Sequence, residues 1–158
     1  MVPDVVIVAE PRNDSAKTTW AIGVGIAIDA VSFAIGTALV GSDPTGLDQA
    51  KTGWITCSAG FTLGPFVAHA MTGQWLRGIA FSAAPLAGTI GNAIVLGAQT
   101  QTIDQMVLNP DQRLVYVFTS VGLLGSVIGL LDVALFKHVR VAPSLSHGGG
   151  GFVVGGSF

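Results

Sequence analysis

Four ionisable side chains lie in stretches that are otherwise almost free of charge: Asp29, His69, Arg77 and Asp132. Carboxyl and imidazole groups can exchange protons, and a guanidinium can hold a carboxylate in an ion pair. A charge inside an apolar environment is costly, so such residues usually face the protein interior and pair with one another. The four residues therefore predict a polar cluster inside an apolar fold.

The composition indicates that this apolar fold lies in a lipid bilayer. Of 158 residues, 50% are hydrophobic and only 10% are charged, whereas soluble domains carry about 25% charged residues. The 22 glycines agree with this class, because glycine lets transmembrane helices approach closely. The net charge of −2 leaves no basic face for nucleic acid.

Four segments are long and apolar enough to be candidate spanning helices, which need about 20 residues. They are Thr19–Gly41, Trp54–Met71, Trp75–Ala98 and Pro110–Phe136. The connection around residues 72–74 is very short, which makes its two helices antiparallel neighbours. The sequence thus predicts an all-α fold, an antiparallel bundle of four transmembrane helices.

This transmembrane domain, residues 19–138, is expected between an N-terminal segment, 1–18, and a glycine-rich tail, 139–158. Five basic residues lie in or beside the N-terminal segment, the 72–74 loop and the tail: Arg12, Lys17, Arg77, Lys137 and Arg140. Two, Lys51 and Arg113, lie by the other two loops. Basic residues are enriched on the cytoplasmic side. We therefore expect a multi-pass membrane protein with both termini in the cytoplasm.

The tail allows two interpretations. Four consecutive glycines, 148–151, favour a flexible end, since glycine raises the entropy cost of ordering. Alternatively, Val139–Leu145 and Phe152–Gly155 form a hairpin, to which residues 4–9 add a third strand. Three strands are about the minimum for a stable small sheet, so this alternative is a small cytoplasmic β element.

The depths of the four candidate residues differ. Asp29 follows Thr19 by ten residues, so at about 1.5 Å per residue it lies about 15 Å deep, near the bilayer midplane. His69, Arg77 and Asp132 lie near the cytoplasmic edge. One interpretation is a structural clasp in which Arg77 neutralises Asp132. The other is a proton or ion pathway that uses Asp29 and His69.

No basic residue is expected at the depth of Asp29. An unpaired carboxylate in a low dielectric is disfavoured relative to the neutral acid. We therefore expect Asp29 to be neutral and hydrogen-bonded to Ser82, Thr89 or Ser126, or to a water molecule.

Small residues and prolines predict close packing and bends in the helices. Pairs spaced by four residues occur at Gly60 and Gly64 and at Gly125 and Gly129, and Ala84, Gly88 and Asn92 make a similar stripe. Prolines inside helices remove a hydrogen bond and favour kinks. The residues assigned to kinks and close packing are Gly64, Pro65, Gly73, Pro85, Gly88, Gly125 and Gly129.

The stretch from Gly64 to Gly91 resembles a group of small bacterial four-helix membrane proteins of uncharacterised activity. That group has a GPxxHxxxGxxxR stretch across helices two and three, followed by a helix with one proline and two glycines. The matching residues are Gly64, Pro65, His69, Gly73, Arg77, Pro85, Gly88 and, with shifted spacing, Gly91. The resemblance covers roughly residues 19–137 and implies no substrate.

Motifs for catalysis or cofactors do not occur in the sequence. Its single cysteine cannot form an internal disulfide, and its three histidines have no metal-site spacing. Neither a GxSxG elbow nor a GxGxxG or Walker loop is found. No metal and no cofactor are predicted, and an enzyme is the least supported class.

The sequence therefore favours a non-enzymatic membrane protein that scaffolds, senses or assembles with others. The alternative is a small proton, ion or solute transporter or channel subunit that uses Asp29 and His69. Besides the lipid bilayer, the partner would be a second copy of the chain or another membrane subunit.

Overall fold

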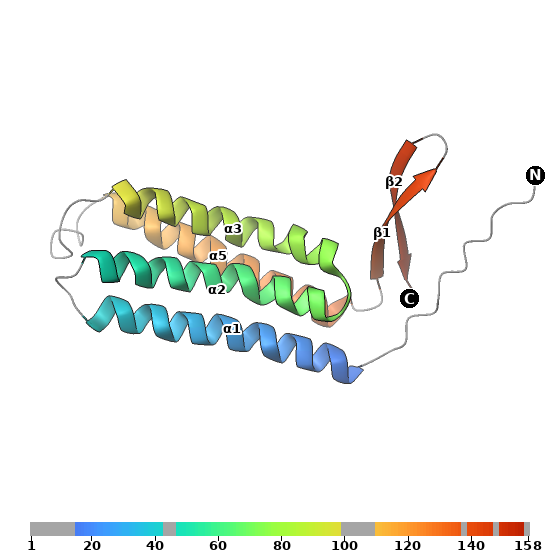
Figure 1. Cartoon of the computed structure of the whole chain (residues 1–158), viewed down its shortest axis with the longest axis horizontal. Coiled ribbons are helices and arrows are strands. Elements are labelled where there is room, and N and C mark those ends of the chain that lie inside the picture. Colours follow the sequence, from blue (N-terminus) through green and yellow to red (C-terminus); the bar gives the residue numbers. More distant parts are fainter. Residues whose placement is uncertain (1–14, 43–46, 99–109, 137–138, 147–148, 157–158) are drawn as a thin grey trace, which may run out of the picture.

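Four long helices and a hairpin make up the structure, a computed structural model that describes residues 15–42, 47–98, 110–136, 139–146 and 149–156 (Figure 1). The helices are α1 (Ser15–Ser42), α2 (Leu47–Met71), α3 (Trp75–Ala98) and α5 (Pro110–Leu135). The strands are β1 (Val139–Ser146) and β2 (Gly149–Gly156).

The helices run in alternating directions, so the start of α1, the α2–α3 turn and the end of α5 lie at one end of the bundle (Figure 1). Helix α2 packs against all three others, α3 packs against α5, and α1 packs mainly on α2. The expected antiparallel arrangement is therefore present. Helix α1 begins at Ser15, four residues before the predicted spanning segment Thr19–Gly41.

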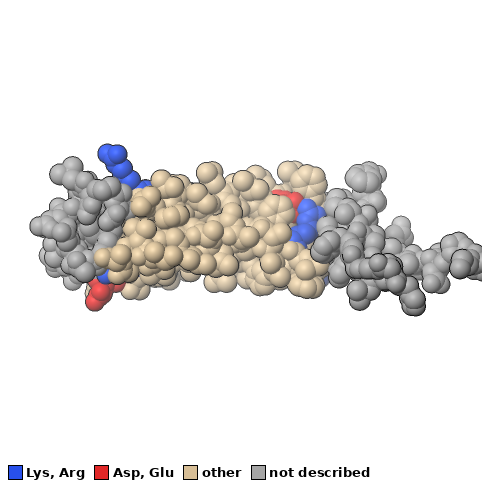
Figure 2. Space-filling view, turned by 90° about the horizontal axis from the view of Figure 1, so that it is seen from above, with Lys and Arg blue, Asp and Glu red and all other residues tan. Residues whose placement is uncertain are grey.

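Among the described residues, three helical segments are long and apolar enough to cross a membrane: α1, α3 and Arg113–Leu135 of α5. Large apolar side chains such as Ile26, Ile94 and Leu124 are more than half exposed on them. Figure 2 shows a broad band without charged side chains, with the visible Lys, Arg, Asp and Glu side chains near its two ends. A surface of this kind suits a lipid environment.

Helix α2 is not among these three segments, although Trp54–Met71 was predicted to span. It begins earlier, at Leu47, with Asp48 and Lys51 in its first turns. Its buried residues include polar ones, among them Ser58 and His69. Since α2 contacts every other helix, it can carry polar residues that a lipid-facing helix could not.

The length of the apolar bundle follows from contacts at its two ends. Trp54 packs against Leu96 and Val115, whereas Trp75 begins α3 at the opposite end. Trp75 and Leu96 are 21 residues apart, which corresponds to about 32 Å of helix. The hydrocarbon core of a bilayer is about 30 Å thick.

Aromatic side chains lie near both ends. Trp20 and Trp75 are 72% and 55% exposed at the end that holds the α2–α3 turn. Trp54 and Tyr116 meet edge to face at the other end, with ring centroids 5.4 Å apart. Tryptophan and tyrosine are enriched at both membrane–water interfaces, so this distribution matches the two edges of a bilayer.

Pro65 lies inside α2 and Pro85 lies inside α3. Glycines on α5 leave space for both proline rings. A Cβ atom on Gly129 would lie 2.7 Å from Cβ of Pro65, and one on Gly125 would lie 2.7 Å from Cδ of Pro85. Gly129 and Gly125 on α5 therefore lie against the rings of Pro65 and Pro85. The stripe on α3 was partly wrong, because Ala84 is exposed.

The buried stripe of α3 instead contains Gly78, Ser82, Pro85, Gly88, Asn92 and Leu96. Gly78 and Leu96 are 18 residues apart, about five turns of 3.6 residues, so the stripe stays on one helix face.

In the tail, β1 and β2 pair antiparallel over eight residues each, from Val139 opposite Gly156 to Ser146 opposite Gly149. The strands thus include the predicted segments 139–145 and 152–155 and extend beyond them. The third strand, predicted at residues 4–9, lies outside the described residues. The cytoplasmic location of this hairpin stays a prediction.

Candidate functional site

The α2–α3 turn positions the first cluster of predicted site residues. Gly73 has a positive φ of 78°, a conformation that glycine adopts without steric cost. The N–H of Gln74 donates to the carbonyl of His69 at 2.8 Å, and that of Gly73 donates to Ala70 at 3.0 Å. These two bonds form a Schellman motif. It reverses the chain and brings Arg77 back beside His69.

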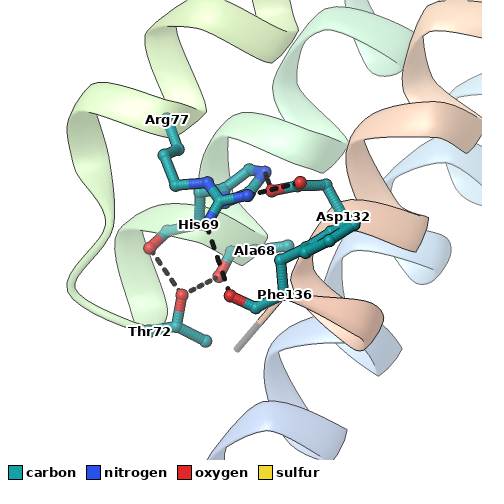
Figure 3. Close-up of polar contacts among 6 residues, drawn as sticks. All are labelled: Ala68, His69, Thr72, Arg77, Asp132 and Phe136. Carbon is teal, nitrogen blue, oxygen red and sulfur yellow. Dashed lines mark hydrogen bonds and ion pairs between the residues drawn. The ribbon is translucent and has the colours of Figure 1, made fainter. Parts of the chain in front are cut away.

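Arg77 joins α3 to the end of α5. Its Nη2 lies 2.5 Å from Oδ1 of Asp132, and its Nη1 donates to the carbonyl of Phe136 at 3.3 Å (Figure 3). The Arg77 and Asp132 side chains are only 14% and 7% exposed. A cation near the last carbonyls also complements the negative end of a helix.

His69 completes what we call the polar clasp, made of His69, Arg77 and Asp132. The imidazole is fully buried, and its Nε2 lies 3.6 Å from Oδ2 of Asp132, slightly beyond hydrogen-bond range (Figure 3). Its ring stacks on Phe81 with centroids 5.4 Å apart. Gly78 leaves the necessary space, since a Cβ there would lie 3.1 Å from Cβ of His69. The three residues therefore meet at one end of the bundle.

Asp29 is separate from the polar clasp. Its Oδ2 accepts a hydrogen bond from the Ser126 hydroxyl, one of the partners expected from the sequence. Its Oδ1 occupies the space that a Cβ on Gly64 would need, so only glycine fits there. We call Asp29, Gly64 and Ser126 the Asp29 site.

The Asp29 site lies about halfway along the apolar bundle. Ser126 is eleven residues after Val115, which contacts the far-end cluster, and ten residues before Phe136 beside the clasp. The helix rise converts these separations to about 16 and 15 Å. Asp29 is also near the middle of α1, and its depth in a bilayer stays a prediction.

A third group of polar residues was not recognised from the sequence as a network. Nδ2 of Asn92 donates to Oγ of Ser58 at 2.7 Å and to Oγ1 of Thr119 at 2.9 Å. The hydroxyls of Thr62 and Thr89 lie 3.0 Å apart, and Thr89 donates to the carbonyl of Ser58 at 2.9 Å. This Asn92 network ties α2, α3 and α5 together on the far side of the Asp29 site.

One sequence signal could have identified the network. Asn92 is an amide in an apolar helix, and in such a helix an amide side chain favours a partner on a neighbouring helix. Its spacing from Gly88 places it on the buried face, but the identity of its partners depends on which helices adjoin α3.

Within the residues that the structure describes, no group of three His, Cys, Asp or Glu side chains could hold a metal ion. Cys57 is buried, with Sγ 3.7 Å from the Phe33 carbonyl. The Ser58 hydroxyl donates to the backbone carbonyl of Trp54, and the Ser126 hydroxyl donates to the Asp29 carboxyl. The arrangement can thus hold helices together and can hold a proton on a carboxyl or an imidazole.

Comparison with known protein families, curated proteins and solved structures finds no match to this chain.

Proposed function

We propose that the chain is a four-helix integral membrane protein that scaffolds, senses or assembles with a partner and catalyses no reaction. The supporting observation is that its buried polar groups link helices in pairs. Arg77 binds Asp132 between α3 and α5, and Asn92 binds side chains of α2 and α5. Buried polar contacts of this kind specify how helices assemble.

In this proposal α2 is the fourth spanning helix. It has 25 residues, close to the 24 of α3, and it packs against all three other helices. If those three cross the bilayer, α2 crosses with them because it lies between them.

The bilayer is proposed to be the bacterial inner membrane, with the clasp end at the cytoplasmic face. Arg77 lies at this end. In the sequence, Arg12 and Lys17 lie before or at the start of α1, and Lys137 and Arg140 come just after the end of α5, and both of these helix ends are at the clasp end. Lipid is then the first partner. The second is another copy of the chain or a different membrane subunit.

A second candidate function is transport of a proton or cation through the bundle. It is supported by the depth of Asp29, whose carboxyl lies about halfway along the apolar helices, and by the burial of His69.

A flux measurement separates the two candidates. Purified protein in liposomes would be given a proton or sodium gradient, with Asp29→Asn as the matched variant. A scaffold predicts that both proteins leak no faster than empty liposomes. A wild-type flux that Asp29→Asn abolishes, with the fold intact, would replace the scaffold proposal by transport.

A further inference from the structure

We propose that Asp29 is a proton-binding site inside the membrane, reached from the clasp end of the bundle and not from the far end. The inference rests on the membrane placement proposed above. It gives the proposed sensor a ligand, the proton, without requiring that protons cross the whole bundle.

The surroundings of Asp29 leave one carboxyl oxygen available. Oδ2 accepts from Ser126, whereas Oδ1 is buried and has no hydrogen-bond partner among the described residues. The backbone of Gly64 bounds this oxygen on the α2 side. The site therefore contains an acceptor atom that no donor of the described chain uses.

Titratable groups on the two helices that contact Asp29 are all distant along those helices. On α2, His69 and Cys57 are five and seven residues from Gly64, and on α5, Asp132 is six residues from Ser126. At 1.5 Å per residue these separations are about 7 to 11 Å. No described charge therefore pairs with the Asp29 carboxyl.

This isolation favours a proton over a metal cation. A metal ion such as calcium requires six or more oxygen ligands, whereas the described side-chain contacts of Asp29 provide one hydroxyl, that of Ser126. A proton neutralises the carboxyl on its free oxygen and needs no further ligands. Neutralisation also removes the cost of a charge at this depth.

Ser82 on α3 supplies an intermediate position between the polar clasp and the Asp29 site. Its side chain is buried, and its Oγ has no hydrogen-bond partner among the described residues. It shares a helix face with Gly78, which lies against His69, and with Pro85, which lies against Gly125. Ser82 is therefore at a level between the clasp and the Asp29 site.

The spacing along α3 suits bridging water. Ser82 is four residues after Gly78 and three before Pro85, or about 6 and 4.5 Å along the helix axis. Two hydrogen bonds through one water span about 5.5 Å. At the clasp, Oδ2 of Asp132 is also buried without a hydrogen-bond donor among the described residues. Available polar atoms thus follow one another from the clasp to Asp29.

The opposite half of the bundle differs. Leu96 and Val115 are each 1% exposed and pack together with Trp54 at the far end. Between them and Asp29, the Asn92 amide nitrogen donates to two hydroxyls, whereas its Oδ1 is buried without a hydrogen-bond partner among the described residues, so only the apolar contacts at the far end distinguish this half. An apolar closure at the far end makes the clasp end the side from which a proton enters.

The test uses the full chain in liposomes with a single orientation and a separate pH on each side. Dicyclohexylcarbodiimide reacts with protonated carboxyls from the lipid phase, and peptide mass spectrometry locates the adduct. We expect an adduct to form on Asp29 when the clasp side is acidic. When the clasp side is alkaline from the start, no adduct should form. The pH on the far side should have no effect.

Two matched variants on α3 test the route. Ser82→Val should abolish the dependence of the adduct on clasp-side pH, because its methyl groups take the place of the hydroxyl and bridging water. Thr89→Val, which alters the far half, should retain that dependence. Both must show wild-type helix content, and Asp29→Asn should give no adduct at this position.

The inference is overturned if Asp29 is unmodified at every pH, if its modification is independent of pH, or if the far side controls it. Unaltered pH dependence in folded Ser82→Val would overturn the route. Labelling of the termini, described below, tests the membrane placement independently. A correct topology with unmodified Asp29 would reject this inference alone, whereas a wrong topology would reject the proposed function.

Discussion

At the scale of single residues, Asp132 has the largest structural role in the polar clasp. Its carboxylate binds the Arg77 guanidinium and lies beside the buried imidazole of His69. A guanidinium that is mostly buried and loses its acceptor keeps its desolvation cost without the compensating bond.

We expect Asp132→Ala to lower the free energy of unfolding by about 1–3 kcal/mol, the range for a buried polar group left unpaired. Thermal unfolding in detergent measures the change. Asp48→Ala is the matched control, because Asp48 is exposed near the start of α2, and its effect should be clearly smaller. Equal unfolding temperatures for the two variants would show that Arg77 finds water instead.

Asp29 calls for a different pair of substitutions. Asparagine keeps the shape and an oxygen acceptor for Ser126, so Asp29→Asn should fold like the wild type. Asp29→Leu loses that bond and presses a methyl group against Gly64, at an expected cost of about 1–3 kcal/mol from overpacking. The same unfolding assay compares them. A leucine variant as stable as the asparagine variant would mean that the helices separate there at little cost.

At the scale of elements, glycines set the distances between helices. On α3, a Cβ at Gly88 would lie 2.6 Å from the backbone oxygen of Phe118 on α5. A backbone atom cannot turn away as a flexible side chain can. The contact between α3 and α5 therefore depends on glycine at this position.

We predict that Gly88→Ala destabilises the bundle by about 1–3 kcal/mol, as overpacked interiors do. Gly97 is the control on the same helix, because no atom lies within 4 Å of its Cβ position. Gly97→Ala should be neutral or stabilising by up to about 1 kcal/mol, since alanine favours helices more than glycine. Similar unfolding temperatures for both variants would argue against close α3–α5 packing.

At the scale of the whole molecule, the alternating directions of the helices place the start of α1 and the end of α5 at one end. In a membrane, both terminal segments then lie on the same side. The distribution of basic residues predicts that this side is cytoplasmic.

Cysteine labelling in intact cells tests this topology. In a Cys57→Ala background, a cysteine at Thr45 or Gln101 should react with an impermeant reagent from outside. Tags at either terminus should react only after the cells are opened. A C-terminal tag that is labelled in intact cells would contradict the predicted orientation.

The helical class could be predicted from the sequence, because few charges and long apolar stretches are typical of helices long enough to cross a bilayer. It also predicted that His69, Arg77 and Asp132 would meet, because each lies near a helix end on the same side. The depth of Asp29 followed from counting residues along one helix. These properties depend on local order and on the constant rise of a helix.

The sequence does not show which helices are neighbours. The pairing of polar groups on different helices therefore becomes visible only in the folded chain. Ser126 was one of three side chains expected as hydrogen-bond partners for Asp29, besides a water molecule. Which of them donates depends on the position of α5 beside α1 and α2. The Asn92 network and the placement of α2 among the other helices could likewise not be predicted from the sequence. Contacts between distant segments depend on how helix surfaces fit together, and hydrophobic patterning along one helix does not specify this fit.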